Sequence, residues 1–345
     1  MKRFPEHINF LTFFVSVFVF LNNTGAQDLH FSQYFNAPLL TNPANTGFEP
    51  DADWRAGVNY RNQWSGILDN PYKTMSAWGD AQLFNDRFEN GWMGTGLVLL
   101  KDVAGSGNLS STKVYGSVAY HQLLGYKSLL SGGFGIGVVN KSIDVSKLTF
   151  NSQWNGKFFD ITIPSNEAFS SSSVWYADLN AGLNYAIFPT DNSYINAGIS
   201  VDHINMPNES FFSNQQADTR VPMRFNFFAN GSFKLNDLWI INPNVYYSSM
   251  SNSTEIVTGM NAHYNLSGDG NTQIIGGLYY RLKDAFIPMV GFTINSISTT
   301  VSYDATTSTL GSSTQTLGAY EISITKAGLF NEQYGKNVKC PSVKF

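Results

Sequence analysis

Residues 175–187 read WYADLNAGLNYAI and alternate between apolar side chains and small or polar ones. The apolar set is Trp175, Ala177, Leu179, Ala181, Leu183, Tyr185 and Ile187, and the opposite set includes Asp178, Asn180, Gly182 and Asn184. Successive side chains of a β-strand point to opposite faces, so the stretch predicts a strand with one apolar and one wet face. Its length exceeds the usual 5–6 residues of a soluble strand, which favours a membrane-crossing one.

The same alternation recurs along the chain, clearly so at 54–64, 220–235 and 254–266. Fourteen candidate strands begin near residues 53, 72, 91, 110, 129, 173, 193, 220, 238, 254, 272, 285, 296 and 317. Aromatic residues gather near the strand ends, as the interfaces of a membrane barrel require. If the first strand starts in the periplasm, the long connections Asp144–Ser172, Asn205–Thr219 and Ala305–Gln315 all fall outside the cell. We therefore expect an all-β fold, a transmembrane antiparallel outer-membrane β-barrel of about 14 strands. A soluble β-sandwich or propeller is the alternative.

Composition excludes several other classes of protein. The chain has 345 residues, of which 15% are aromatic and only 13% charged, with 30 Gly, one Cys and a net charge of -4. One cysteine cannot build a disulfide scaffold, and the charge balance does not suit a nucleic-acid binder. A mean hydropathy of -0.15 is too polar for a bundle of membrane helices. A large soluble β protein or an outer-membrane barrel remains.

The first residues predict export. Lys2 and Arg3 precede an apolar run at 10–21, and small residues follow at 24–26. This order is typical of a cleaved signal peptide, and the run is too short to span a bilayer. We expect a signal peptide at 1–26, a periplasmic or lumen-plugging segment at 27–52, the barrel at 53–326 and a periplasmic tail at 327–345. The expected location is the cell outer membrane.

Two groups of aromatic residues are candidate functional residues. The first lies in the long external loops and consists of Trp154, Phe158, Phe159, Ile161, Phe211 and Phe212. Rigid aromatic side chains dominate binding hot spots, so this group predicts a partner-binding surface; packing on one another as a lid is the alternative. The second group, Phe31, Tyr34 and Phe35, precedes the first strand. It makes that segment too apolar to float freely and predicts a plug in the lumen, the alternative being a disordered tail.

The sequence gives little support for catalysis or for a cofactor. His263 shares a strand face with Glu255 and Asn261, but no serine is placed next to them where a hydrolase would need its nucleophile. The five histidines are scattered, so we expect no metal site and no cofactor. Gly132–Gly137 continues as a strand and opens no helix, which argues against a phosphate loop. Cys340 is unpaired within the chain and is either a free thiol or a link to a partner.

Several motifs resemble the PorP/SprF family. They are FSQY at 31–34 followed by NPA at 42–44 and Gly47, GVNYRNQW at 57–64, ADLNAGLNY at 177–185, SVDHIN at 200–205, SYD at 302–304, YEI at 320–322 and Cys340-Pro341. The resemblance spans the whole mature chain. It implies an outer-membrane barrel of the type IX secretion system.

The resemblance also implies partners. One branch of the family associates with the secretion apparatus and its periplasmic parts. The other pairs with a large secreted adhesin, recognises its C-terminal sorting domain and holds it at the surface, often for gliding. We expect a non-enzymatic anchor of this second kind, in contact with outer-membrane lipid and not with nucleic acid. A component docked to the periplasmic machinery and a transport channel are the alternatives.

Overall fold

Fourteen strands form the wall of the protein. The computed structural model describes residues 29, 31–66, 68–85, 87–125, 127–167, 169–212, 219–308, 318–331, 343 and 345. The strands are β1 Trp54–Gln63, β2 Tyr72–Leu83, β3 Gly91–Ala104, β4 Leu109–Leu123, β5 Ser128–Ser142, β6 Ser173–Thr190, β7 Ser193–Asp202, β8 Arg224–Asn236, β9 Trp239–Met250, β10 Ser253–Asn265, β11 Thr272–Arg281, β12 Ala285–Ile294, β13 Ile297–Thr306 and β14 Ala319–Gly328.

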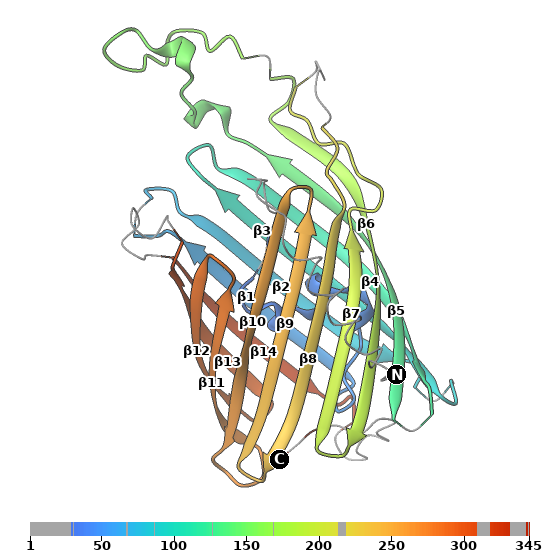
Figure 1. Cartoon of the computed structure of the whole chain (residues 1–345). Helices are drawn as coiled ribbons and strands as arrows, with labels where there is room; N and C mark the ends of the chain where they lie inside the picture. Colours follow the sequence, from blue (N-terminus) through green and yellow to red (C-terminus); the bar gives the residue numbers. More distant parts are fainter. Residues whose placement is uncertain are drawn as a thin grey trace, which may run out of the picture.

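Each strand pairs antiparallel with its neighbours in the chain, and β14 returns to β1 with Gly328 opposite Trp54 (Figure 1). The sheet is therefore a closed barrel, which confirms the predicted fourteen-stranded fold. The strand starts fall close to the predicted positions, and β14 runs to Gly328, slightly beyond 326.

The start of β8 differs more, because the strand begins at Arg224 and not near 220. The preceding residues pair with the loop that leads up to them. Asn208 and Arg220 form an isolated bridge, and the Val221 N–H donates to the Pro207 carbonyl at 2.9 Å. Pro222 then has no N–H to give to a sheet ladder, so the regular strand starts after it.

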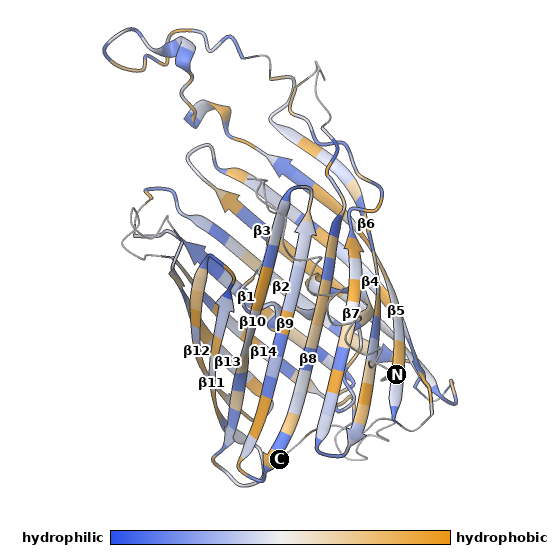
Figure 2. Ribbon diagram, in the orientation of Figure 1, coloured by the Kyte–Doolittle hydropathy of each residue, from blue (hydrophilic) through white to orange (hydrophobic). Residues whose placement is uncertain are grey.

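The two faces of the wall differ as the alternation predicts. On β10, Met260 is 53% exposed on the outer face, whereas its neighbour Asn261 is 5% exposed and faces inward. Figure 2 shows hydrophobic and hydrophilic residues alternating along the strands. Apolar side chains such as Leu97, Ile136 and Val290 thus face the bilayer, and polar ones face the lumen.

The two ends of the barrel differ in the length of their connections. Residues 191–192, 237–238 and 295–296 are minimal turns at one end, where β1 starts and β14 ends. Asn295 and Ser296 both have positive φ, at 48° and 64°, as a two-residue type I′ hairpin needs. The connections 143–172 and 203–223 lie at the other end, where the green loop after β5 extends far from the wall (Figure 1). Short turns mark the periplasmic end of such barrels, so the long loops are extracellular.

Before β1 the chain lies inside the barrel. Residues 31–48, called here the lumen segment, contain three short helices: η1 Tyr34–Asn36, α2 Pro38–Thr41 and η2 Pro43–Asn45. The segment contacts β13 and β14 on one wall and β5 and β6 on another. Only a position within the lumen reaches both walls. Among the described residues, no helix is long and apolar enough to cross a membrane.

Candidate functional site

A cluster of buried charges holds the beginning of the lumen segment. The Glu321 carboxylate of β14 accepts the backbone N–H groups of Ser32 and Gln33 at 2.6 and 2.9 Å. The same carboxylate pairs with Arg61 of β1, which also reaches Asp304 of β13 at 2.8 Å. Arg281 joins at 3.0 Å from Asp304. Buried carboxylates and guanidinium groups satisfy one another here, so removing one member leaves an uncompensated charge.

The middle of the lumen segment touches the backbone of the opposite wall. Asn42 donates from Nδ2 to the carbonyls of Leu183 in β6 and Ile199 in β7, at 3.0 Å each. A side chain at Gly133 of β5 would collide with the backbone of residues 43 and 44, and one at Gly94 of β3 would collide with the Thr46 carbonyl. These two glycines permit an approach that no larger residue allows.

Phe31, Tyr34 and Phe35 all lie in this contact region. Tyr34 is 4% exposed and stacks on Tyr246 of β9 with ring centroids 4.7 Å apart, and Phe35 stacks on Tyr279 of β11 at 5.2 Å. Burial raises the pKa of the Tyr34 hydroxyl well above its ordinary value. Phe31 is buried against Leu100 of β3 in a different cluster. The three aromatic residues therefore pack on two separate parts of the wall.

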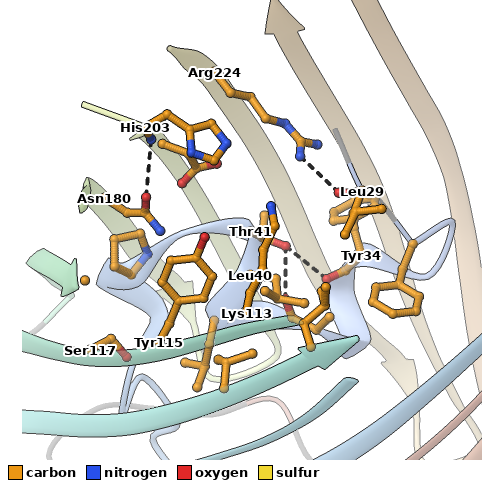
Figure 3. A pocket seen from close by; sticks show the side chains of 18 of the residues that line it. Leu29, Tyr34, Leu40, Thr41, Lys113, Tyr115, Ser117, Asn180, His203 and Arg224 are labelled. Carbon is orange, nitrogen blue, oxygen red and sulfur yellow. Dashed lines mark hydrogen bonds between the residues drawn. The ribbon is translucent and has the colours of Figure 1, made fainter. Parts of the chain in front are cut away.

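A small cavity of about 70 Å³ remains between the lumen segment and strands β3 to β9 (Figure 3). Two of its lining residues, Tyr115 and His203, contact Asp178 of β6. The Tyr115 hydroxyl donates to the Asp178 carboxylate at 2.5 Å, and His203 Nδ1 lies 2.9 Å from it. Arg224 donates to the Leu29 carbonyl at 3.1 Å, as Figure 3 shows. Sequence reasoning missed the group of Asp178, His203 and Tyr115. The only signal was the alternation, which places Asp178 on the lumen face.

The lumen segment runs along most of the barrel axis. Leu29, two residues before the lumen segment, lines a second cavity of about 400 Å³ at the extracellular end. Lys141 and Glu209 form an ion pair in the lining of this cavity, and Tyr176 donates to Glu209 at 2.9 Å. The chain thus enters β1 at the periplasmic end, whereas Leu29 lies at the extracellular end.

The extracellular surface carries the first group of aromatic residues. In the outer loop, residues 143–172, Trp154 and Phe159 pack edge to face at 5.1 Å. Phe158 is 59% exposed and Ile161 is 75% exposed. The loop is held by its own turns: the Asp160 carboxylate accepts from the backbone and hydroxyl of Thr162, which lowers the pKa of Asp160. An ordered loop thus presents exposed apolar side chains.

Phe211 and Phe212 belong to the other long loop, at 203–223. Phe212 is 42% exposed and stacks on Phe169 with centroids 4.8 Å apart. The Phe211 carbonyl accepts from the backbone N–H of Ser170 at 2.9 Å. These contacts join the two long loops, and we call the joined loops the outer rim. Phe169 was missed from the sequence, where nothing marked its partner.

The residues considered for hydrolysis are separated by the length of β10. His263 lies toward the periplasmic end, with Nδ1 2.9 Å from Gln273 Oε1. Glu255 lies toward the extracellular end and pairs with Arg281 at 3.0 Å. A shared strand face does not make them one site. The described part of the chain contains no group of three or more His, Cys, Asp or Glu suited to a metal ion. Cys340 and the expected signal peptide lie outside the described residues.

Comparisons with solved structures show a similarity of fold only. The P. putida toluene transporter TodX is 12% identical with a TM-score of 0.50, over 86% of this chain and 95% of that one. The Ralstonia pickettii toluene transporter TbuX is 13% identical with a TM-score of 0.49, over 89% and 96%. The translocator domain of the autotransporter NalP from Neisseria meningitidis is 10% identical with a TM-score of 0.44, over 86% and 95%. No curated protein matches the chain.

A family model establishes the family. The model for the type IX secretion system membrane protein PorP/SprF matches residues 23–325. A membrane protein with a closed β-barrel, an apolar outer face and long loops at one end is an outer-membrane protein. The chain belongs to the PorP/SprF family of type IX secretion system membrane proteins.

Proposed function

We propose that this barrel binds a secreted protein at its outer rim and anchors that protein to the cell surface. The partner would carry a C-terminal sorting domain and act in adhesion or gliding. The observation that carries the proposal is the ordered outer loop, which holds Phe158 and Ile161 exposed far from the membrane. Exposed apolar groups on an ordered scaffold favour protein binding.

The filled lumen supports a binding role over a transport role. The lumen segment is fixed by the charge cluster on one wall and by backbone contacts on the other. Displacing it would remove the two backbone N–H groups of Ser32 and Gln33 that the Glu321 carboxylate accepts. The proposed anchor therefore works without an open channel. Binding energy comes from the outer rim, and retention comes from the apolar outer face of the barrel in the membrane.

Affinity purification of the tagged barrel from its native membrane, followed by mass spectrometry, tests the proposal. We expect one large secreted protein with a C-terminal sorting domain at near-equal amounts. The double variant Phe158→Ser/Ile161→Ser should lose that protein. The matched control is Phe330→Ser, which changes an exposed aromatic residue close to Asp53 at the periplasmic end.

Two results would contradict the proposal. Recovery of periplasmic secretion components with no secreted protein would favour docking to the machinery. A barrel that returns alone would favour a channel.

A further inference from the structure

A third cavity, of about 430 Å³, opens toward the periplasmic end of the lumen. Its lining residues follow the short turns: Tyr194 comes after turn 191–192, Asn242 after turn 237–238 and Ser298 after turn 295–296. The lumen segment closes it on the outer side. We call this cavity the periplasmic vestibule. It shares no residue with the outer rim, and its volume is within the usual range for small-ligand sites.

Side-chain amides dominate the polar lining of the periplasmic vestibule. They come from β7 to β10 and from the lumen segment: Asn196, Asn230, Asn242, Asn244, Asn261 and Asn36. Asn36, Asn242, Asn244 and Asn261 each donate one or more hydrogen bonds to neighbouring protein groups. An amide has two donor hydrogens and an acceptor oxygen without a net charge, so the capacity that remains is uncharged. The charged lining residues Glu49 and Arg55 pair with each other at 3.5 Å. The lining is thus suited to an uncharged ligand with many hydroxyl or amide groups.

One amide has no partner inside the protein. Asn196 is 6% exposed, and its Oδ1 is buried without a hydrogen bond. A buried polar atom without a hydrogen bond destabilises the fold, so an unpaired Asn196 at this position indicates a functional role such as ligand binding. Asn230 is also weakly held, by a 3.5 Å contact from the Tyr34 hydroxyl. Both residues line the same cavity and lie opposite each other on the adjacent strands β7 and β8.

We propose that the periplasmic vestibule binds an uncharged oligosaccharide. Sugar hydroxyls both donate and accept, which matches a ring of amides, and the partly buried Phe35 and Tyr194 provide apolar surface for a sugar ring. A polypeptide is less suited, because peptides commonly bind by adding a strand to a sheet edge. Every strand of the described barrel is already paired on both sides, so the lumen offers no such edge.

Calorimetric titration of the full-length protein in detergent tests this proposal. The probes are two neutral sugars, N-acetylglucosamine tetramer and maltotetraose, with a cationic glucosamine tetramer, an anionic galacturonate tetramer and an uncharged Gly-Ser peptide for comparison. We expect saturable binding of a neutral sugar. Asn196→Leu should weaken it about tenfold or more, and Asn230→Leu should act in the same direction. Asn140→Leu, at the extracellular end of β5, should bind as the unchanged protein does.

The stability of the variants separates a ligand site from a structural role. Because Asn196 Oδ1 has no partner in the fold, Asn196→Leu should keep or raise the thermal midpoint while losing affinity. Absence of saturation with both neutral sugars at millimolar concentrations would overturn the proposal. Tighter binding of a charged sugar or of the peptide would overturn it as well. So would an affinity of Asn196→Leu and Asn230→Leu for the neutral sugar that equals the affinity of the unchanged protein. None of these results bears on the outer rim.

Discussion

At the scale of single residues, Glu321 connects the lumen segment to the wall. Its carboxylate accepts two backbone N–H groups and pairs with Arg61, all within the buried part of the lumen. Glu321→Ala leaves those donors unsatisfied, and we expect a loss of about 3 to 5 kcal/mol in the free energy of unfolding. Thermal unfolding in detergent measures it.

The control for this prediction lies on the same face of β14. Ser323 accepts one hydrogen bond, from Asn59, so Ser323→Ala should cost only about 0.5 to 1.5 kcal/mol. A cost for Glu321→Ala no larger than that of the control would contradict the role given to the carboxylate.

Gly133 tests the close approach of the lumen segment to β5. The variant Gly133→Val places a side chain where the backbone of residues 43 and 44 lies, and we expect a loss of about 1 to 3 kcal/mol, together with protease access to the segment. The control is Gly132→Val on the outer face, where a Cβ meets Leu183 at an ordinary 3.6 Å. Equal effects of the two variants on limited proteolysis would refute the contact.

The sequence predicted which face of a strand a residue lies on, but not which distant residue it contacts. Alternation placed Asp178 and Glu255 on the wet face, because that pattern is local. It did not pair Ser32 with Glu321, because these residues lie 289 positions apart and meet only when the lumen segment lies inside the closed barrel. It did not pair Asp178 of β6 with His203 either, because His203 lies beyond the end of β7, where the alternation stops. The sequence of β5 did not show that residues 43 and 44 approach Gly133.

At the scale of elements, the strands were predictable and the loops were not. Successive residues of each strand face the lipid and the lumen in turn, so the strand starts and the two faces can be predicted from the alternation of apolar and polar residues. The outer loop has no such period. The sequence showed its aromatic content, but the stacking of Phe169 on Phe212 depends on the path of the loop.

The outer loop provides a pH prediction. Hydrogen bonds from Thr162 lower the pKa of Asp160 below its ordinary 3.8, and those from Ser146 do the same for Asp144. A lowered pKa means that the stabilisation is complete above the ordinary value and is lost as the pH falls through the folded pKa. We expect the loop to keep its order from pH 7 down to the ordinary value and to loosen below it.

Electron paramagnetic resonance of a spin label reports this change. The label is attached at Lys157→Cys in a Cys340→Ser background, and its mobility should rise only below pH 3.8. Adding Asp160→Asn should make the label mobile at every pH. A mobility change centred near neutral pH would contradict the assignment to these carboxylates.

At the scale of the whole molecule, the filled lumen predicts an electrically silent barrel. In a planar bilayer the unchanged protein should show no steady conductance, because the lumen segment lies between the periplasmic vestibule and the extracellular cavity. Deletion of residues 31–48 should open a conducting pore, with heat-modified gel migration showing that the barrel still forms. Stable conductance by the unchanged protein would support a channel instead.

The central claim is that the outer rim, at the extracellular end, binds the secreted partner. Photo-crosslinking in living cells tests it most directly, with Phe158→benzoylphenylalanine in the outer loop and Phe330→benzoylphenylalanine at the periplasmic end; both side chains are exposed, by 59% and 66%. We expect position 158 to form an adduct with a secreted protein that carries a C-terminal sorting domain, and position 330 to form none with it. Adducts with periplasmic proteins at 330, and none at 158, would contradict the account.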